Sequence, residues 1–141
     1  MKLAFVLDVN IVVSAMLVQH EGAAPFRAFQ AVFDPGFQHY VSAALVGEYE
    51  EVLTRPALSI RHGLAHLAIV ELVELIRTAS VEVEPPAASR SAPDPNDQHL
   101  WDLLAAEPEV LLVTGDPVLL RSDHFAGRVL APREFVQRYV S

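Results

Sequence analysis

Short apolar runs alternate with helical segments along the chain, and this alternation constrains the fold more than any other feature. Leu3–Leu7 and residues 109–114 (EVLLVT) are the clearest runs, and continuous apolar runs of this length are typical of strands buried on both faces. Further short strands are predicted at Phe37–Val41, around Val81 and Val83, and at Val129–Leu130. Strands that alternate with helices form parallel sheets covered on both faces. The sequence therefore predicts an α/β fold with a central parallel sheet.

The segments between the predicted strands carry helix signals. Helices are predicted to begin near Asn10, Ala23, Ser42, Gly63, Asp94, Asp116 and Pro132. Residues 55–62 (RPALSIRH) are interpreted as a basic connector, and residues 84–97 (EPPAASRSAPDPND) as an internal loop. Neither side of that loop is long enough for a complete domain, so a single domain over residues 1–141 is expected.

Composition narrows the class of protein. The chain has 141 residues, of which 52% are hydrophobic and 20% charged, a globular composition. It has no cysteine, which excludes disulfides, thiolate zinc sites and cysteine nucleophiles. Asp8 and Asn10 interrupt the first apolar run, so we interpret it as a core strand and not as a signal peptide. No apolar stretch approaches the roughly 18 residues of a membrane span, and a soluble cytoplasmic protein is expected.

The net charge of −8 argues against a surface built generally to hold polyanions. Acidic proteins do bind nucleic acid where clustered carboxylates hold a divalent metal, so the positions of the acids matter more than their sum. Asp8 ends an apolar run with no cation nearby. Burying an ionised carboxylate without a partner costs several kcal/mol. Something must therefore neutralise it, or it must reach the surface.

Four acids lie just after predicted strands or in the helices that follow them. Asp8 directly follows the first strand, and Asp116 follows the LLVTG strand by one turn. Glu48 lies about two turns into the helix after the second strand, and Asp97 opens the helix after the long loop. Ligands of parallel α/β sheets bind beyond the carboxyl ends of the strands. We therefore expect these carboxylates to converge at one edge, with Asn10 beside them.

Four carboxylates in one cleft repel one another, and without a metal at least one would keep its proton near neutral pH. A divalent cation removes this conflict. An all-oxygen set of ligands suits Mg²⁺ or Mn²⁺. The expected cofactor is therefore Mg²⁺ or Mn²⁺.

Five motifs in their order resemble those of PIN-domain proteins, especially the VapC-like toxins of prokaryotic toxin–antitoxin pairs. LDVNIVVSA (7–15) resembles the opening LDTN motif, and SAALVGEYEEVLTRP (42–56) the helix that carries the second acid. DPNDQHLWDLLAA (94–106) and LLVTGDPVLL (111–120) resemble the motifs of the third and fourth acids. LAPREFV (130–136) resembles the final helix. The resemblance covers essentially the whole chain.

The resemblance implies a three-layer α/β/α sandwich and a metal-dependent ribonuclease that hydrolyses phosphodiester bonds of RNA. It maps the metal ligands to Asp8, Glu48, Asp97 and Asp116. Asn10 and Thr114 would position water or a phosphate oxygen. The resemblance also implies a cognate antitoxin that blocks the cleft, and homodimers are common in this group.

Two positions depart from the family pattern. Val9 replaces the usual threonine of the first motif, which removes a hydroxyl near the site and puts rate or substrate placement in doubt. Ala131 replaces the usual hydroxyl cap of the last helix, which should weaken that helix start by about 1 kcal/mol. Neither departure touches a carboxylate.

Purely structural alternatives stand beside these site assignments. Asp94 and Asp116 each precede proline, as helix N-caps do. Asp97 could be the capping-box partner of Asp94, although the family spacing favours it as a ligand. Asn10 could cap the helix that begins there. Glu50 and Glu51 lie on the same predicted helix as Glu48, but only Glu48 matches the motif.

Histidine and tryptophan residues are weaker candidates for metal ligands or substrate contacts. His62 and His66 are four residues apart, but no third metal ligand accompanies them. His99 lies close to Asp97 and is interpreted as a solvated helix residue in preference to a substrate contact. Trp101 belongs to an apolar stripe and is predicted to be core. Scattered cations that could hold phosphates are Arg55, Arg61 and Arg121.

Two other functions remain as alternatives to the ribonuclease. A metal-binding PIN-fold module that binds RNA or protein with little nuclease activity is suggested by Val9 and by the acidic net charge. A phosphoryl-transfer domain would also place an aspartate after its first strand. It would need a second aspartate near Asp8 and a lysine at the site, but position 10 is Asn10, and Lys2, the one lysine, precedes the strand.

Overall fold

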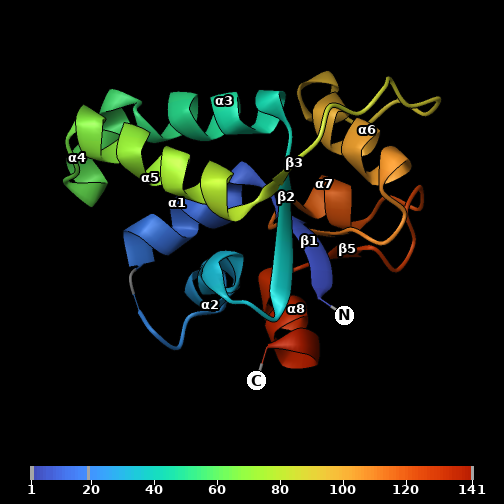
Figure 1. Cartoon of the computed structure of the whole chain (residues 1–141), viewed down its shortest axis with the longest axis horizontal. Coiled ribbons are helices and arrows are strands. Elements are labelled where there is room, and N and C mark those ends of the chain that lie inside the picture. The colour runs from blue at the N-terminus through green and yellow to red at the C-terminus, as the bar shows by residue number, and fades with distance from the viewer. Residues whose placement is uncertain (1, 19, 141) are drawn as a thin grey trace.

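A parallel β-sheet runs through the centre of the protein (Figure 1). The computed structural model describes residues 2–18 and 20–140, and within them the sheet has five strands in the order β3-β2-β1-β4-β5. All neighbouring strands pair in parallel. The strands are β1 Leu3–Leu7, β2 Phe37–Val41, β3 Val81–Glu82, β4 Leu111–Val113 and β5 Val129–Leu130. The predicted α/β fold with a central parallel sheet is confirmed.

Helices cover both faces of this sheet. They are α1 Val9–Val18, α2 Ala24–Gln30, α3 Ala43–Leu53, α4 Pro56–His62, α5 His66–Ala79, α6 Gln98–Ala106, α7 Pro117–Leu120 and α8 Pro132–Tyr139, with short 3₁₀ turns at Ala31–Phe33 and Pro95–Asp97. In Figure 1, α1 to α5 lie on one side of β1 and β2, and α6 and α7 lie on the other. Parallel crossovers are almost always right-handed, and connections that run first toward β3 and then back toward β5 therefore place helices on both faces.

One predicted connector is a helix. Pro56–His62 form α4, so the interpretation of residues 55–62 as only a basic connector was wrong. Pro56 stands at the first turn of α4, and Gly63 closes it in the left-handed conformation with φ of 71°. Proline at the start and glycine just past the end are the ordinary signals of a short helix.

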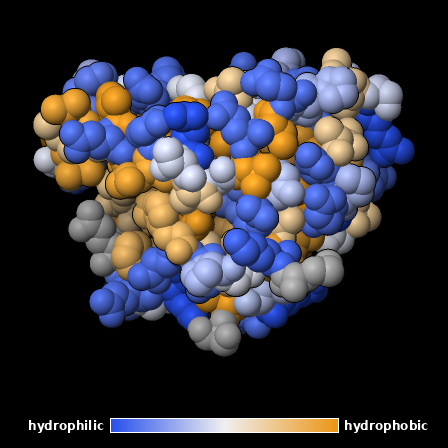
Figure 2. Space-filling model, in the orientation of Figure 1, coloured by the Kyte–Doolittle hydropathy of each residue, from blue (hydrophilic) through white to orange (hydrophobic). Residues whose placement is uncertain are grey.

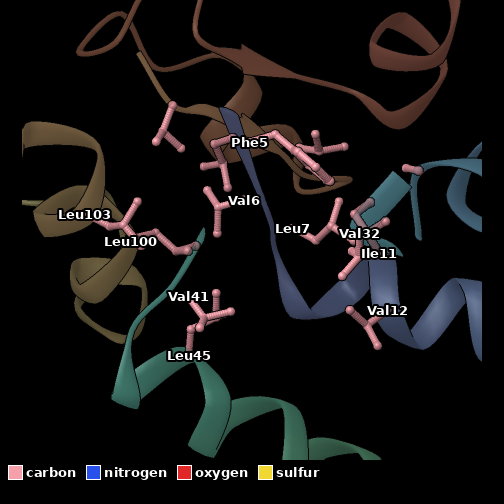
Figure 3. Packing of buried hydrophobic residues seen from close by; sticks show 14 of the residues in the cluster. Phe5, Val6, Leu7, Ile11, Val12, Val32, Val41, Leu45, Leu100 and Leu103 are labelled. Carbon is pink, nitrogen blue, oxygen red and sulfur yellow. The ribbon is translucent and has the colours of Figure 1, made fainter. Parts of the chain in front are cut away.

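Side chains of β1 form the centre of the core, as Figure 3 shows. Phe5, Val6 and Leu7 are fully buried. Leu100 of α6 packs on one side of β1, and Ile11 of α1 lies on the other (Figure 3). A strand that is apolar on both faces is what two covering helical layers require. Trp101 is also fully buried, which confirms its prediction as core.

The chain changes direction across the sheet between β1 and β4. From β1 it proceeds through β2 to β3, and it then returns to place β4 on the other side of β1. The N–H of Asp8, just after β1, donates to the carbonyl of Val113 at the end of β4 (2.9 Å). Such a switch point opens a crevice outside the carboxyl ends of the two strands, where open α/β sheets bind their ligands.

Tyr49 ties α3 to the end of β1. It is fully buried, and its hydroxyl donates a hydrogen bond to the carbonyl of Leu7. Tyr49→Phe leaves that buried carbonyl without its partner, so we expect a loss of about 1–3 kcal/mol in the free energy of unfolding, measured by urea denaturation. Tyr40→Phe is the control, because the Tyr40 hydroxyl makes only an exposed 3.5 Å contact to Glu109. Equal losses in the two variants would contradict this role of Tyr49.

The face of the molecule drawn in Figure 2 is largely polar, with an apolar region at one end. Orange side chains gather over the end of the molecule that holds α4 and α5 (Figure 2). Ile60 of α4 is 84% exposed and Leu67 of α5 is 67% exposed. No helix among residues 2–18 and 20–140 has both the length and the apolar composition needed to cross a membrane.

Candidate active site

Asp8 joins the ends of β1 and β4. It is 3% exposed, and its Oδ1 accepts the N–H of Val9 (2.7 Å). Its Oδ2 accepts the hydroxyl of Thr114 (2.7 Å) and the amide of Asn10 (3.2 Å). Burial raises the pKa of Asp8, the hydrogen bonds from Thr114 and Val9 lower it, and the charge of Glu48 raises it further. The protein thus holds this buried carboxylate with three hydrogen-bond donors, and the charge of the nearby His99 ring also lowers its pKa.

Asn10 links α1 to the loop after β4. Besides its bond to Asp8, its amide nitrogen lies 3.4 Å from Thr114 Oγ1, and its Oδ1 accepts the N–H of Gly115 (3.0 Å). This side chain therefore reaches across to a second strand end and does not cap the helix that begins at Val9. The cap alternative for Asn10 was wrong.

Thr114 and Asp116 continue the same network. Thr114 is fully buried, donates to Asp8 and accepts the backbone N–H of Asp116 (3.0 Å). Asp116 caps α7 through Oδ1, which accepts the N–H of Val118 (2.9 Å). The predicted cap is confirmed. A carboxylate has about four acceptor sites, so capping by one oxygen leaves Asp116 able to bind a cation.

Glu48 meets His99 across α3 and α6. Glu48 Oε2 lies 3.4 Å from His99 Nε2, and the two side chains are only 24% and 16% exposed. His99 is therefore not the solvated residue that the sequence suggested. Glu48 Oε1 and His99 Nδ1 are both buried with no hydrogen-bond partner. A buried oxygen that lacks a hydrogen-bond partner needs an explanation, and a role as a metal ligand is one.

The negative charges of the other three acids raise the pKa of Asp97. The pKa of Asp97 is raised to about 6, chiefly by burial. The remaining causes are the negative charges of Asp8, Asp94, Glu48 and Asp116. Because Coulomb interactions between side chains fade with distance and screening, these carboxylates share one neighbourhood. The structure thus brings together acids that are as far apart in sequence as residues 8 and 116.

Asp94 and Asp97 differ in their roles. Asp94 accepts the N–H of Asn96 (2.9 Å) and caps the 3₁₀ turn, as the sequence predicts. Asp97 precedes α6 but makes no side-chain cap bond to it. The structure therefore does not show the capping-box role for Asp97. Ala131 likewise makes no cap bond to α8.

The four carboxylates have the type of donor atom that a hard divalent cation prefers, but they do not already form a complete coordination site. In the described part of the chain, no three His, Asp or Glu side chains are already arranged to hold a metal ion. Mg²⁺ usually keeps several waters and takes only one or two carboxylates, so it does not require such a cage. The donors are all carboxylate oxygens, and Glu48 Oε1 has no partner. Asp8, Glu48, Asp97 and Asp116 could therefore hold such an ion through side chains and water.

Other sequence candidates have structural roles. His62 Nε2 lies 2.9 Å from the carbonyl of Leu53, and its Nδ1 accepts the N–H of Leu64 (3.0 Å). Both ring nitrogens are thus in use, and His62 is not available to form a metal pair with His66. Trp101 donates its indole N–H to His124 (2.9 Å) within the core and does not offer a face for stacking bases.

Comparison with known families agrees with this geometry. A family model described as PIN domain matches residues 4–117, a span that holds all four carboxylates. No curated protein and no solved structure matches the chain. PIN domains are generally nuclease folds that bind divalent metals. The match extends over most of the sequence, and the chain therefore belongs to the PIN domain family.

Proposed function

We propose that this protein is a Mg²⁺- or Mn²⁺-dependent endoribonuclease of the cytoplasm, the toxin of a toxin–antitoxin pair. The observation that supports this most is the raised pKa of Asp97, about 6, to which the charges of Asp8, Glu48 and Asp116 contribute. Such mutual destabilisation of carboxylates is typical of functional sites. The protein tolerates it at the switch point of the sheet, where ligands bind.

In this proposal Asp8, Glu48, Asp97 and Asp116 hold the metal directly or through water. The bound ion supplies an acidified water and offsets charge on the phosphate and the leaving oxygen. Asn10 and Thr114 keep the Asp8 carboxylate fixed through their hydrogen bonds to Oδ2. Burial and the neighbouring charges raise the pKa of Asp97 to about 6, so its carboxylate is suited to accept a proton from the attacking water.

Mn²⁺ should raise the melting temperature, because it offsets the repulsion among the carboxylates. At ten times the dissociation constant, binding adds about 1.4 kcal/mol to the free energy of unfolding, which corresponds to a rise of about 4 °C. Asp97→Asn should reduce that rise. Differential scanning fluorimetry with and without Mn²⁺ measures it.

Asp123→Asn is the matched control, because Asp123 is exposed and lies outside the cluster. Its melting temperature should respond to Mn²⁺ as the unaltered chain does. An equal Mn²⁺ response in Asp97→Asn would argue against Asp97 as a metal ligand.

A binding module without appreciable nuclease activity is the second candidate. Val9 favours it, because valine brings no hydroxyl to the position beside Asp8. Stabilisation by Mn²⁺ without cleavage of any member of a varied RNA set would support this candidate over the enzyme.

The role as a toxin rests on the resemblance of the motifs. Expression of the unaltered chain should stop growth of the host cell, and Asp8→Asn should remove that effect at equal protein levels. An antitoxin is the proposed partner and a homodimer the proposed assembly. A small gene for a DNA-binding protein beside this one, whose product restores growth and co-purifies, would support the pairing. Growth arrest that persists with Asp8→Asn would contradict it.

A further inference from the structure

A small cavity lies beside Glu48, and we infer that it binds an unpaired guanine base next to the phosphate that is cleaved. The cavity has a volume of about 140 Å³. It is lined by Ser42, Ala43, Ala44, Glu84, Pro85, His99 and Asp102. The inference rests on the proposed ribonuclease function, because it places the base next to the phosphate that is cleaved, but the guanine preference can be measured without catalysis.

The position of the cavity couples it to the acidic cluster. His99 lines the cavity, and its Nε2 lies 3.4 Å from Glu48 Oε2, so one imidazole separates the two sites. Ser42 directly follows β2, at the same sheet edge where Asp8 follows β1. A base in the cavity would therefore carry its own sugar and phosphate toward the carboxylates.

The cavity is small and opens to solvent, since Ala43, Ala44 and Glu84 in its lining are exposed. A water molecule takes about 30 Å³ of liquid, so the cavity holds the equivalent of four or five waters. Sites for drug-sized ligands are larger, about 300–1,000 Å³. The lining by Ala43, Ala44 and Pro85 is apolar, and the His99 ring offers a flat face on which a base can stack. One planar ring system fits this space.

Hydrogen-bond donors come from the first turn of α3. The helix begins at Ala43, and the N–H groups of its first residues have no acceptor within the helix. Ser42 Oγ accepts the N–H of Leu45 (3.2 Å). Ala43 and Ala44 both line the cavity and belong to this first turn, so we infer that their N–H groups bind an acceptor such as a carbonyl oxygen of a base.

Hydrogen-bond acceptors come from two carboxylates. Asp102 Oδ1 already accepts the N–H of Ala88 (2.8 Å) and the amide of Gln98 (3.0 Å), which fixes the loop before α6. Glu84 follows β3, is exposed, and forms no ion pair with any residue of the described chain. Glu84 is therefore the acceptor that a ligand can use. The two negative charges also repel a phosphate, so the base and not the backbone enters.

Guanine is the base whose edge matches these groups. Its N1–H and N2–H₂ are two adjacent donors that one carboxylate can accept together, and its O6 accepts from a backbone N–H. Adenine and cytosine place an acceptor nitrogen beside their amino group, where the carboxylate of Glu84 would repel it. Uracil offers a single N–H between two carbonyls. Glu84 with the first turn of α3 thus favours guanine.

Binding of neutral nucleosides tests the inference without metal or cleavage. In EDTA, guanosine should shift the backbone amide NMR signals of Ala43 and Ala44 in the full chain. Adenosine, cytidine, uridine and inosine, which lacks the N2 amino group, should bind at least about fivefold more weakly, the lower end for a bidentate contact to a base. Glu84→Gln should remove that preference. Equal binding of all five nucleosides would overturn the proposal.

Glu71→Gln is the control for charge, because Glu71 is exposed on α5 and does not line the cavity. It should keep the guanosine preference. If Glu71→Gln and Glu84→Gln lose the preference equally, Glu84 is not the acceptor and the assignment fails.

RNA oligomers distinguish a base of the substrate from a free guanine nucleoside. In EDTA, a uridine oligomer with one central guanosine should bind about fivefold or more tightly than an all-uridine oligomer of the same length, by fluorescence anisotropy. Binding of guanosine without this preference would assign the cavity to a free ligand and refute the RNA assignment. Since neither experiment requires turnover, loss of the guanine preference leaves the ribonuclease proposal standing, and an inactive protein that prefers guanosine refutes only the ribonuclease.

Discussion

Asp8→Asn is expected to lower Mn²⁺-dependent RNA cleavage by about 100-fold or more. A catalytic metal ion contributes several kcal/mol to transition-state stabilisation, and each 1.36 kcal/mol is a factor of ten in rate. Asp8 is the most enclosed of the four acids and accepts three hydrogen bonds, so no neighbouring carboxylate can take its place. Single-turnover cleavage of a labelled RNA at saturating Mn²⁺ measures the loss.

The fold of Asp8→Asn should remain intact. Burial raises the pKa of Asp8, which means that its ionised form is costly in the folded protein. Removal of the charge favours the folded state, but the amide nitrogen of asparagine cannot accept at least one of the three hydrogen bonds that the carboxylate accepts. The two effects oppose each other, so the metal-free melting temperature should change by no more than about 5 °C. Asp123→Asn is the control for charge and should keep full activity, because Asp123 is exposed. Cleavage by Asp8→Asn at the unaltered rate would refute the assignment.

The parallel sheet was predictable because its strands are apolar on both faces. Phe5, Val6 and Leu7 leave no polar face, and a strand of this kind requires cover on two sides. The helix α4 was missed although Pro56 and Gly63 mark both of its ends. Its residues are exposed or half-buried, so its sequence lacks the apolar periodicity that is typical of a buried helix.

The approach of the acids was predictable from the topology, but their contacts were not. Strand ends at one edge of a parallel sheet bring Asp8 and Asp116 together regardless of side-chain detail. The contact between His99 and Glu48 depends on how α6 packs against α3, which no local pattern encodes. The one available signal was the position of His99 two residues after Asp97, at the start of the same helix.

The cavity beside Glu48 could not be predicted from the sequence. Its lining comes from three separate segments, namely the start of α3, the residues after β3 and the first turns of α6. A gap between packed elements is a property of their relative placement. A helix was predicted to begin near Ser42, and the structure confirms this with Ser42 as the N-cap of α3, but a cap alone says nothing about a cavity next to it.

His39 should make the protein less stable in acid than at neutral pH. The residue is 1% exposed on β2, and burial lowers its pKa from 6.5 to about 3. Its Nε2 accepts the N–H of Leu7 (3.1 Å), so the ring proton lies on Nδ1, which donates to Ser80 Oγ (2.7 Å). Ser80 donates onward to the carbonyl of Ile76 (2.6 Å). Protonation of Nε2 would direct a second proton at the amide of Leu7, so the folded state keeps the ring neutral.

The unfolded chain binds a proton at His39 near pH 6.5 and the folded chain only near pH 3. The contribution of the neutral His39 ring to the free energy of unfolding is therefore present in full above about pH 6.5 and is lost as the pH falls toward 3. Between pH 7 and pH 5 the loss is about 2 kcal/mol, at 1.36 kcal/mol for each pH unit below the unfolded pKa. Urea denaturation at the two pH values measures it. The raised pKa of Asp97 makes the folded state more stable as the pH falls, which opposes the effect of His39. The pH dependence of the unaltered chain is therefore compared with that of a variant that retains Asp97.

His39→Gln keeps Asp97 and every other titratable group, so the difference between its pH dependence and that of the unaltered chain isolates His39. The variant should lack the loss of about 2 kcal/mol between pH 7 and pH 5. His20→Gln, a change at an exposed ring, should retain it. If His39→Gln proves too unstable to compare, NMR of the unaltered chain gives the same answer, because the His39 ring signals should not titrate above about pH 4. Titration of that ring near pH 6.5 would show that the buried chain of hydrogen bonds does not hold it neutral.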